Sequence, residues 1–234
     1  MIFIINLNDA KTRFNVASKQ LDEIQLEYLR VPAFDQSRIA TEECRYVTQG
    51  IAAIWRSHIK AMKLFLESSE DFVIIMEDDF KITNRSAFIK SNSVFLNNNL
   101  DLLQMGFLNT GIDVYLLRKL EHLQFILLRL ISSLGRVSSF IDARISQRMR
   151  IRDIRDFSNE LVPYSFLPGA HCYIISRKLA KEIIEMNDPQ FLSTDDFFTA
   201  LARMRRFRMC RLRSSAVTQS NLPSQVGLRF PENS

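Results

Sequence analysis

Four short runs of apolar residues, rich in β-branched side chains, recur along the chain and are bounded by polar residues. Runs of this length and composition are typical of strands that are buried on both faces of a sheet. The pattern therefore predicts four strands, at residues 2–7 (IFIINL), 72–76 (FVIIM), 101–107 (DLLQMGF) and 172–176 (CYIIS).

Between these runs, apolar residues recur at the three- and four-residue spacing of amphipathic helices. The predicted helices span about Thr12 to Leu26, Gly50 to Ser68 and Arg177 to Met186. Strands that alternate with helices indicate an α/β fold with a mostly parallel central sheet, and such sheets bind ligands at the carboxyl ends of their strands. Gly and Pro number only six each and no stretch resembles a linker, so we expect a single domain over residues 1–234.

The segment at about 111–160 interrupts this alternation. Its leucines are spaced alternately by four and three residues, which places on one stripe of a helix Leu116, Leu120, Leu123, Leu127, Leu130 and Leu134. Such a stripe fits a helix packed on the core, a seam with a partner helix, or a helix lying on a membrane. The arginine-rich stretch RISQRMRIRDIR at 144–155 follows, and anionic membranes attract this combination. We expect a basic amphipathic helical insertion here.

The net charge of +5 is unevenly distributed along the chain. The excess of basic residues lies at 118–156 and 203–213, and the remainder of the chain is acidic. Each basic patch could face an anion or could simply be a solvated surface. Neither patch interleaves aromatic residues with its arginines in the way that a stacking platform for nucleic acid does, so we expect no nucleic-acid partner.

The first residues, MIFIINLNDAK, have no basic lead-in and no small-residue cleavage site, so they predict a strand and not a signal peptide. No segment reaches the length of apolar residues that a membrane span requires. The three cysteines, Cys44, Cys172 and Cys210, match neither a disulfide framework nor a zinc pattern. We expect a cytoplasmic protein. The basic insertion adds the expectation of peripheral contact with the inner face of the cytoplasmic membrane.

Three successive carboxylates, Glu77, Asp78 and Asp79, directly follow the predicted strand FVIIM. A parallel sheet would place them at the edge where ligands bind. Adjacent carboxylates repel one another, and a site that holds them usually supplies a cation such as Mg²⁺ or Mn²⁺, which prefer oxygen ligands. The simpler alternative is an acidic turn that only solvates its charge.

Four segments, in this order, resemble glycosyltransferase family 25, the lipopolysaccharide and lipooligosaccharide galactosyltransferase group that also includes collagen galactosyltransferases. They are IINLNDAKTRF, VPAFDQ, GIAAIWRSHIKAMKLFLES leading into MEDDF, and PGAHCYIISRKLAKEII followed by STDDFF. The resemblance covers about residues 1–110 and 164–220. Two departures are Met62, where the family often has Trp, and the Ser193–Thr194 pair, where it often has Pro.

The resemblance implies a Rossmann-like nucleotide-sugar domain of the GT-A type and an enzyme that transfers a sugar with inversion. The first candidate donor is UDP-galactose, and the acceptor is a lipopolysaccharide or another glycan or glycolipid. The alternatives are a catalytically silent family member that acts as a scaffold and, less favoured, an anion- or nucleic-acid-binding protein that uses its Arg clusters.

The resemblance also implies roles for individual residues. Nine residues match the donor-binding positions: Asn6, Leu7, Arg13, Ala33, Asp35, Ser57, His58, Glu77 and Asp78. The expected ligands of Mn²⁺ or Mg²⁺ are Glu77, Asp78, Asp79 and His171. Inversion needs a base near the acceptor hydroxyl. Asp195 matches the late Asp of the family and Asp196 is adjacent to it, so one of these two is the expected base. Residues 193–196 also fit a capping box at the start of the helix DDFFTALARM.

We expect the segment at 112–156 to bind anionic lipid. Replacing Arg148, Arg150 and Arg152 by Gln should reduce the fraction of protein that floats with anionic vesicles, because each basic residue near such a surface contributes about 1 kcal/mol. Vesicles of neutral lipid are the control. Flotation that is unchanged in the triple variant would count against this contact.

Overall fold

The computed structural model of the chain describes residues 1–41, 44, 47–108, 157–186 and 192–220. The chain divides into two compact units, Met1–Leu108 with Ser158–Ser234, and Asn109–Phe157. The fold and the site described below belong to the first unit. The predicted helical insertion and its leucine stripe fall almost wholly on residues 109–156, which lie outside the described residues.

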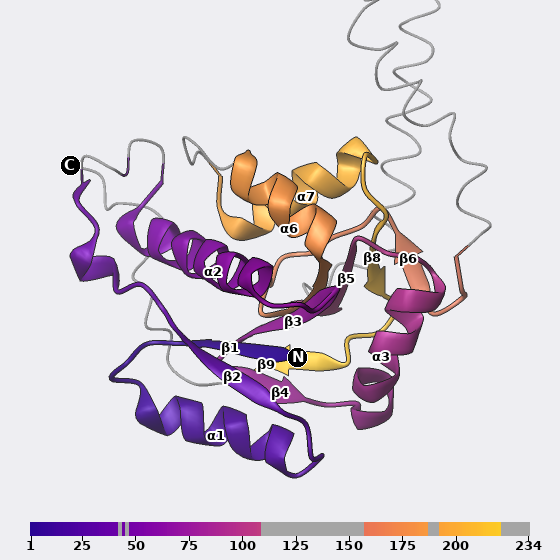
Figure 1. The fold of residues 1–234 in the computed structure, drawn as a ribbon, viewed down its shortest axis with the longest axis horizontal. Helices are drawn as coiled ribbons and strands as arrows, with labels where there is room; N and C mark the ends of the chain where they lie inside the picture. Colours follow the sequence, from indigo (N-terminus) through magenta and orange to yellow (C-terminus); the bar gives the residue numbers. More distant parts are fainter. Residues whose placement is uncertain (42–43, 45–46, 109–156, 187–191, 221–234) are drawn as a thin grey trace, which may run out of the picture. The chain divides into compact units, whose positions relative to one another are not determined.

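Nine strands form one sheet in the described part of the chain (Figure 1). Their bounds are β1 Ile2–Asn6, β2 Tyr28–Pro32, β3 Phe72–Glu77, β4 Phe80–Ile82, β5 Leu102–Gly106, β6 Leu161–Pro163, β7 Cys172–Ser176, β8 Met209–Leu212 and β9 Val217–Gln219. The main path runs β2-β1-β3-β7-β5-β8-β6, while β9 pairs with β4 and β5. Six of these strands point in one direction and β4, β6 and β7 point in the other. The predicted α/β fold with a mostly parallel sheet is confirmed.

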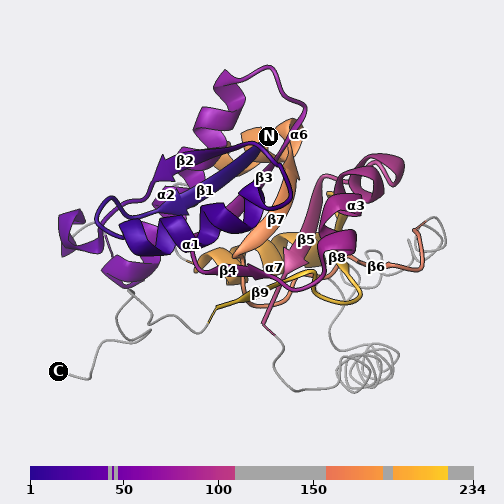
Figure 2. The same ribbon diagram turned by 90° about the horizontal axis from the view of Figure 1, so that it is seen from below.

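Helices cover both faces of this sheet (Figures 1 and 2). One face carries α2 Gln49–Glu67, α6 Arg177–Glu185 and α7 Thr194–Met204, and the other carries α1 Lys11–Asp22 and α3 Arg85–Asn97. The three predicted helices are present, but α1 ends before the predicted Leu26. Gln25 has a left-handed φ of 55°, and the Leu26 amide bonds back to the Leu21 carbonyl at 3.1 Å, which closes the helix.

The main apolar core lies between the sheet and the first of these helical layers. Alternate side chains of β1 and β3 face α2, which buries large residues against them, including Trp55, Met62 and Phe65. Burial of one such side chain contributes about 1.5–3 kcal/mol. Met62 is fully buried in this core, so the departure from the family's Trp at this position is a matter of packing.

Arg177, the Arg of the YIISRK segment, ties α6 to the end of α2. Its guanidinium donates to the carbonyl oxygens of Leu66 at 2.9 Å, Ser68 at 2.6 Å and Glu70 at 2.7 Å. The last carbonyls of a helix have no partner within the helix, and this side chain supplies one. The Arg therefore holds α2 in place along the sheet.

None of the helices in the described residues is long and apolar enough to cross a membrane.

Candidate functional site

A cleft with a volume of about 890 Å³ opens at the carboxyl ends of β1, β2 and β3. The loops after these strands, the first half of α2, residues 169–171 and the start of α7 line it. Because β7 runs antiparallel to β3, the residues that precede β7 lie at the same edge of the sheet. The volume is within the range of small-ligand pockets in proteins.

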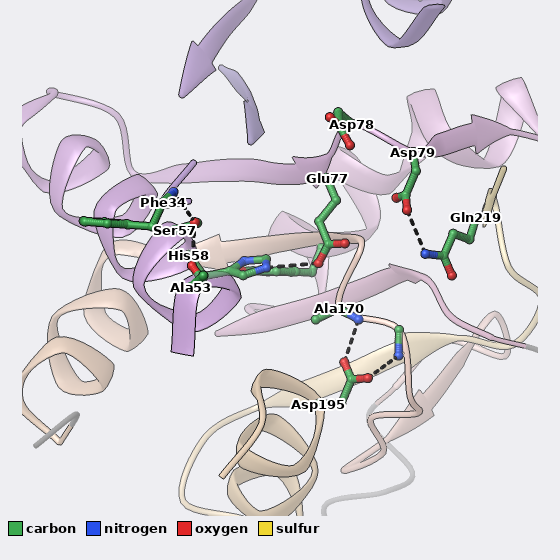
Figure 3. Close-up of polar contacts among 12 residues, drawn as sticks. Phe34, Ala53, Ser57, His58, Glu77, Asp78, Asp79, Ala170, Asp195 and Gln219 are labelled. Atoms are coloured by element: carbon green, nitrogen blue, oxygen red, sulfur yellow. Dashed lines mark hydrogen bonds and ion pairs between the residues drawn. The ribbon is translucent and has the colours of Figure 1, made fainter. Parts of the chain in front are cut away.

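The three carboxylates at the end of β3 point in different directions from this edge (Figure 3). Glu77 is the last residue of β3, and Asp78 and Asp79 form the turn that leads to β4. Glu77 extends toward α2, whereas Asp79 extends toward β9. Their mutual repulsion is therefore reduced by divergence, and each carboxylate meets a different element of the fold.

Glu77 is held by a buried chain of side chains that runs into the core. Its Oε1 lies 3.2 Å from His58 Nε2, and His58 Nδ1 lies 2.8 Å from the Tyr173 hydroxyl. Burial raises the pKa of Tyr173 well above its ordinary value, so the hydroxyl keeps its proton and can hydrogen-bond to Nδ1. The Glu77 carboxylate can only accept, so His58 Nε2 is the donor in the other contact.

Asp78 is engaged at both of its carboxylate oxygens. Asn6 Nδ2 donates to Asp78 Oδ2 at 2.6 Å, and Arg13 pairs with Asp78 Oδ1. Asn6 is buried at the end of β1, and its amide also donates to the Ala10 carbonyl at 3.1 Å, which fixes the loop before α1. This loop and α1 carry Arg13 to the cleft.

Asp79 is held by a residue far away in the sequence. Gln219 Nε2 of β9 donates to Asp79 Oδ2 at 2.7 Å, and Arg13 lies 3.3 Å from the same oxygen. The Ser220 amide donates to the Asp79 carbonyl oxygen at 2.6 Å. Asp79 Oδ1 is buried and has no hydrogen-bond partner among the residues that the structure describes.

The protonation of the three carboxyls is shifted in opposite directions. Burial opposes the ionisation of Glu77, but the hydrogen bond from His58, with the positive charge that His58, His171 and Arg13 can carry, lowers the pKa of Glu77 below its ordinary value. Burial raises the pKa of Asp78 against the bonds from Asn6 and Arg13. Burial and the charge of Glu77 raise the pKa of Asp79 against the bond from Gln219 and the charge of Arg13.

Asp195 and Asp196, the expected acceptor-side carboxylates, both line the cleft but have different contacts. Asp195 accepts from two backbone amides, those of Gly169 at 3.0 Å and Ala170 at 2.8 Å (Figure 3). Asp196 is exposed, and its carboxylate accepts from the Ser193 hydroxyl at 2.7 Å. Its backbone amide donates to the same hydroxyl oxygen at 3.2 Å. Ser193 is therefore the N-cap of α7 as predicted, but Asp196 bonds to the Ser193 hydroxyl and not to its backbone amide, so only half of the capping box forms. Asp195 additionally anchors the loop that precedes β7.

His171 follows this anchored loop and is enclosed by two glycines. A Cβ added to Gly106 would lie 2.6 Å from His171 Nε2, and one added to Gly169 would lie 2.9 Å from Nδ1. Gly169 also has a φ of +105°, which favours glycine. His171 is buried, and neither of its ring nitrogens has a hydrogen-bond partner within the described part of the chain.

The other expected donor-site residues lie at the same cleft, chiefly as parts of its framework. Ser57 of α2 donates to the Ala53 carbonyl at 2.7 Å and accepts from the Phe34 amide at 2.8 Å, which ties the loop after β2 to α2 (Figure 3). Asp35 accepts from the amide of Ser37 at 2.9 Å and from its hydroxyl at 2.8 Å, and these bonds lower the pKa of Asp35.

Leu7 and Ala33 contribute their backbones. The Leu7 carbonyl accepts from the Ala10 amide and from Arg30, both at 3.0 Å, and the Ala33 amide donates to the Asn6 carbonyl at 2.9 Å. Both residues line the cleft. Together with Phe34, Ile51 and Ile54 they are among the apolar residues that line it.

The donor atoms of the cleft suit a divalent ion, although the arrangement is not a complete ligand set. No three His, Cys, Asp or Glu side chains among the described residues are placed to hold a metal together. Asp79 Oδ1 and the His171 nitrogens are nevertheless buried and unpartnered, and both residues line the cleft. Leaving such a group unsatisfied costs about 1–3 kcal/mol. A carboxylate oxygen and an imidazole nitrogen are ligands that Mn²⁺ accepts, so these two residues fit the ion.

Two residues of the site were not predicted from the sequence. Tyr173 lies in the YIISRK segment, but only the fold shows that its hydroxyl reaches His58. Gln219 is separated from Asp79 by 140 positions, and no local pattern marks it. The only sequence signal for this contact would have been a predicted pairing of β4 with β9. Both strands are only three residues long, which is too short for a recognisable pattern.

No protein-family model matches the chain, and no curated protein sequence matches it. Among solved structures, it is similar to that of the galactosyltransferase LgtC in complex with donor and acceptor sugar analogs. The TM-score is 0.42 and the identity is 11%, over 95% of this chain and 87% of that chain. A likeness at this level establishes neither the family nor the activity of this chain.

We expect Asp79→Asn to raise the thermal unfolding midpoint at pH 8 in the absence of added metal. The substitution removes a charge that burial and Glu77 disfavour, and about 1 kcal/mol corresponds to about 2–4 °C in a chain of this size. The raised pKa of Asp79 means that the folded wild type binds a proton more tightly than the unfolded chain, so its stability falls as pH rises from the ordinary carboxyl pKa through the raised one.

The increase in the unfolding midpoint caused by Asp79→Asn should therefore be larger at pH 8 than at pH 4, as measured by calorimetry at both pH values. Asp71→Asn, at an exposed position before β3, is the matched control and should change the midpoint little. An Asp79→Asn variant that is less stable than the wild type at pH 8 would contradict the electrostatic account.

Proposed function

We propose that the chain is a metal-dependent glycosyltransferase of family 25 that works at the cytoplasmic face of a membrane. It transfers a sugar with inversion, with galactose from UDP-galactose as the first candidate, onto a lipopolysaccharide or another cell-surface glycan. The observation that carries the proposal is the carboxylate cluster at the end of β3, which lies in one cleft with the buried, unpartnered atoms of Asp79 and His171. The four ordered segments that resemble family 25 support it.

In this proposal the cleft binds the donor along its length. The apolar lining residues Leu7, Ala33, Phe34, Ile51 and Ile54 take the nucleoside. Glu77 is held ionised and oriented by His58, and its second oxygen accepts a hydroxyl of the ribose or of the sugar. The transferred sugar then lies toward residues 169–171 and the start of α7.

The polar groups of the cleft take the diphosphate. Asp79 and His171 would hold Mn²⁺ or Mg²⁺, and the ion would stabilise the negative charge that develops on the leaving diphosphate. Arg13, which lines the same cleft, presents a guanidinium whose geometry suits phosphate oxygens. Asp78 is already engaged at both oxygens by Asn6 and Arg13, so its role is to position these two residues.

Asp196 is the better candidate for the base. The base must accept the proton of the acceptor hydroxyl as the new bond forms. Asp195 is committed to two backbone amides and holds the loop that carries His171, whereas Asp196 is exposed and bonded through one oxygen. We therefore assign the proton transfer to Asp196 and the positioning of the loop to Asp195.

The enzyme class is tested with a panel of nucleotide sugars, assayed for hydrolysis and for transfer to glycan acceptors. We expect turnover of UDP-galactose that requires Mn²⁺ or Mg²⁺ and is lost in a strong chelator. Asp79→Ala should lower the rate by about 100-fold or more, because a charge that holds the ion is removed. Asp71→Ala is the matched control. Full activity of Asp79→Ala, or of the wild type in chelator, would exclude the metal role.

The assignment of the base is tested by comparing Asp195→Asn with Asp196→Asn. Asp196→Asn keeps an oxygen for the Ser193 hydroxyl, so we expect a normal unfolding midpoint, an unchanged KM for the donor and transfer lowered about 10²–10⁴-fold. Asp195→Asn should lose about 1–3 kcal/mol of stability, because an amide group then faces a backbone amide. Wild-type transfer by Asp196→Asn would reject its role as base.

A further inference from the structure

The guanidinium of Arg13 already provides a positive charge at the carboxylate cluster. It pairs with Asp78 Oδ1 and lies 3.3 Å from Asp79 Oδ2. The side chain of Arg13 is 14% exposed and those of the two aspartates are 9% exposed. Ion pairs with so little exposure are weakly screened by solvent and salt. Arg13 is therefore the internal counter-charge of the two aspartates.

This pairing leaves few oxygen atoms for another cation. Arg13 engages one oxygen of each aspartate, Asn6 takes the second oxygen of Asp78, and Gln219 shares Asp79 Oδ2. Asp79 Oδ1 is the one oxygen of this pair of aspartates that is buried without a partner in the described structure. Asp79 itself is only 7% exposed and His171 only 2% exposed, so both bury unpartnered atoms at the cleft that Arg13 also lines.

A divalent ion and a guanidinium cannot occupy the same carboxylate oxygens. An ion bound at Asp79 would place two positive charges within a few ångströms of Arg13, in a region of low solvent exposure where like charges repel strongly. Asp78 could bind the ion, or Asp79 could offer both of its oxygens, only as Arg13 withdraws.

We propose that Arg13 is a built-in competitor of the divalent ion, displaced from Asp79 when the ion binds and then available to an anion in the same cleft. This inference rests on the proposed function and deepens it, because the anion with the matching chemistry is the diphosphate of the donor. Arg13 lines the cleft, so its guanidinium exchanges carboxylate oxygens for phosphate oxygens without leaving it. Metal and nucleoside diphosphate consequently bind with positive coupling through Arg13.

The test measures Mn²⁺ binding to the full chain by isothermal titration calorimetry, first with the metal alone. We expect Arg13→Gln to bind Mn²⁺ at least about 10-fold more tightly than the wild type, since the competitor and its charge are both removed. Arg30→Gln is the matched control. Arg30 lies near the same loop but donates to the carbonyls of Leu7 and Asn8 at 3.0 and 3.2 Å, so its loss removes one positive charge and two loop contacts without removing a partner of the two aspartates.

The second measurement is the affinity for UDP with and without Mn²⁺. In the wild type, Mn²⁺ should lower the Kd for UDP. In Arg13→Gln the ratio of the Kd without Mn²⁺ to the Kd with Mn²⁺ should be smaller, because only the direct attraction between the ion and UDP then contributes to it. Arg13→Lys keeps one positive charge at the site and guards against poor folding of the Gln variant. It should bind Mn²⁺ more tightly than the wild type, because both carboxylate contacts are made by Arg13 Nη2 and the Lys side chain ends one bond short of that atom.

The outcomes separate the inference from the proposed function. If the wild type binds Mn²⁺ and neither Arg13 variant binds it more tightly than Arg30→Gln does, the competition is refuted while the metal-dependent activity stands. If neither the wild type nor any variant binds Mn²⁺, alone or together with UDP, both the competition and the metal role of the proposed function are refuted.

Discussion

The separate compensation of three adjacent carboxylates is the constraint on which the rest of the site depends. Glu77, Asp78 and Asp79 follow one another at the end of a buried strand, where solvent screens their repulsion poorly. They coexist because each accepts from a different neutral or imidazole donor, namely His58 for Glu77, Asn6 for Asp78 and Gln219 for Asp79, and because the two aspartates share the positive charge of Arg13. Loss of one partner of a buried pair leaves an uncompensated charge, which generally costs several kcal/mol.

These partners come from separate parts of the fold, so the site requires most of the described unit. His58 stands on α2 on one face of the sheet, Arg13 on α1 on the other, and Gln219 on β9. The position of α2 depends in turn on Arg177, which caps its end, and on Ser57, which joins it to the loop after β2. The electrostatics of the cleft is thus a property of the assembled sheet and not of the acidic motif alone.

The sequence predicted what local interactions determine. Apolar runs marked β1, β3, β5 and β7 because buried strands need continuous apolar side chains, and Ser193 with Asp196 marked the start of α7 because a helix cap is a contact over three residues. Strands of three or four residues, such as β4 and β9, have too little pattern to be detected. The contact from Gln219 to Asp79 therefore could not be predicted, because it depends on the pairing of these two strands.

The acidic motif correctly predicted that Glu77, Asp78 and Asp79 lie at the edge of the sheet. It did not reveal which residues balance their negative charge. A cluster that relied on a bound ion would make folding depend on the supply of metal, as structural metal sites do. Arg13 and His58 supply compensation from within the chain, so the carboxylates can be buried before any ligand arrives. The consequence is a lower affinity for a free ion, because the ion must replace contacts that already exist. Under the proposed function, a diphosphate that arrives with the ion would offer Arg13 new oxygens, and such a site would favour the complete donor over either of its parts.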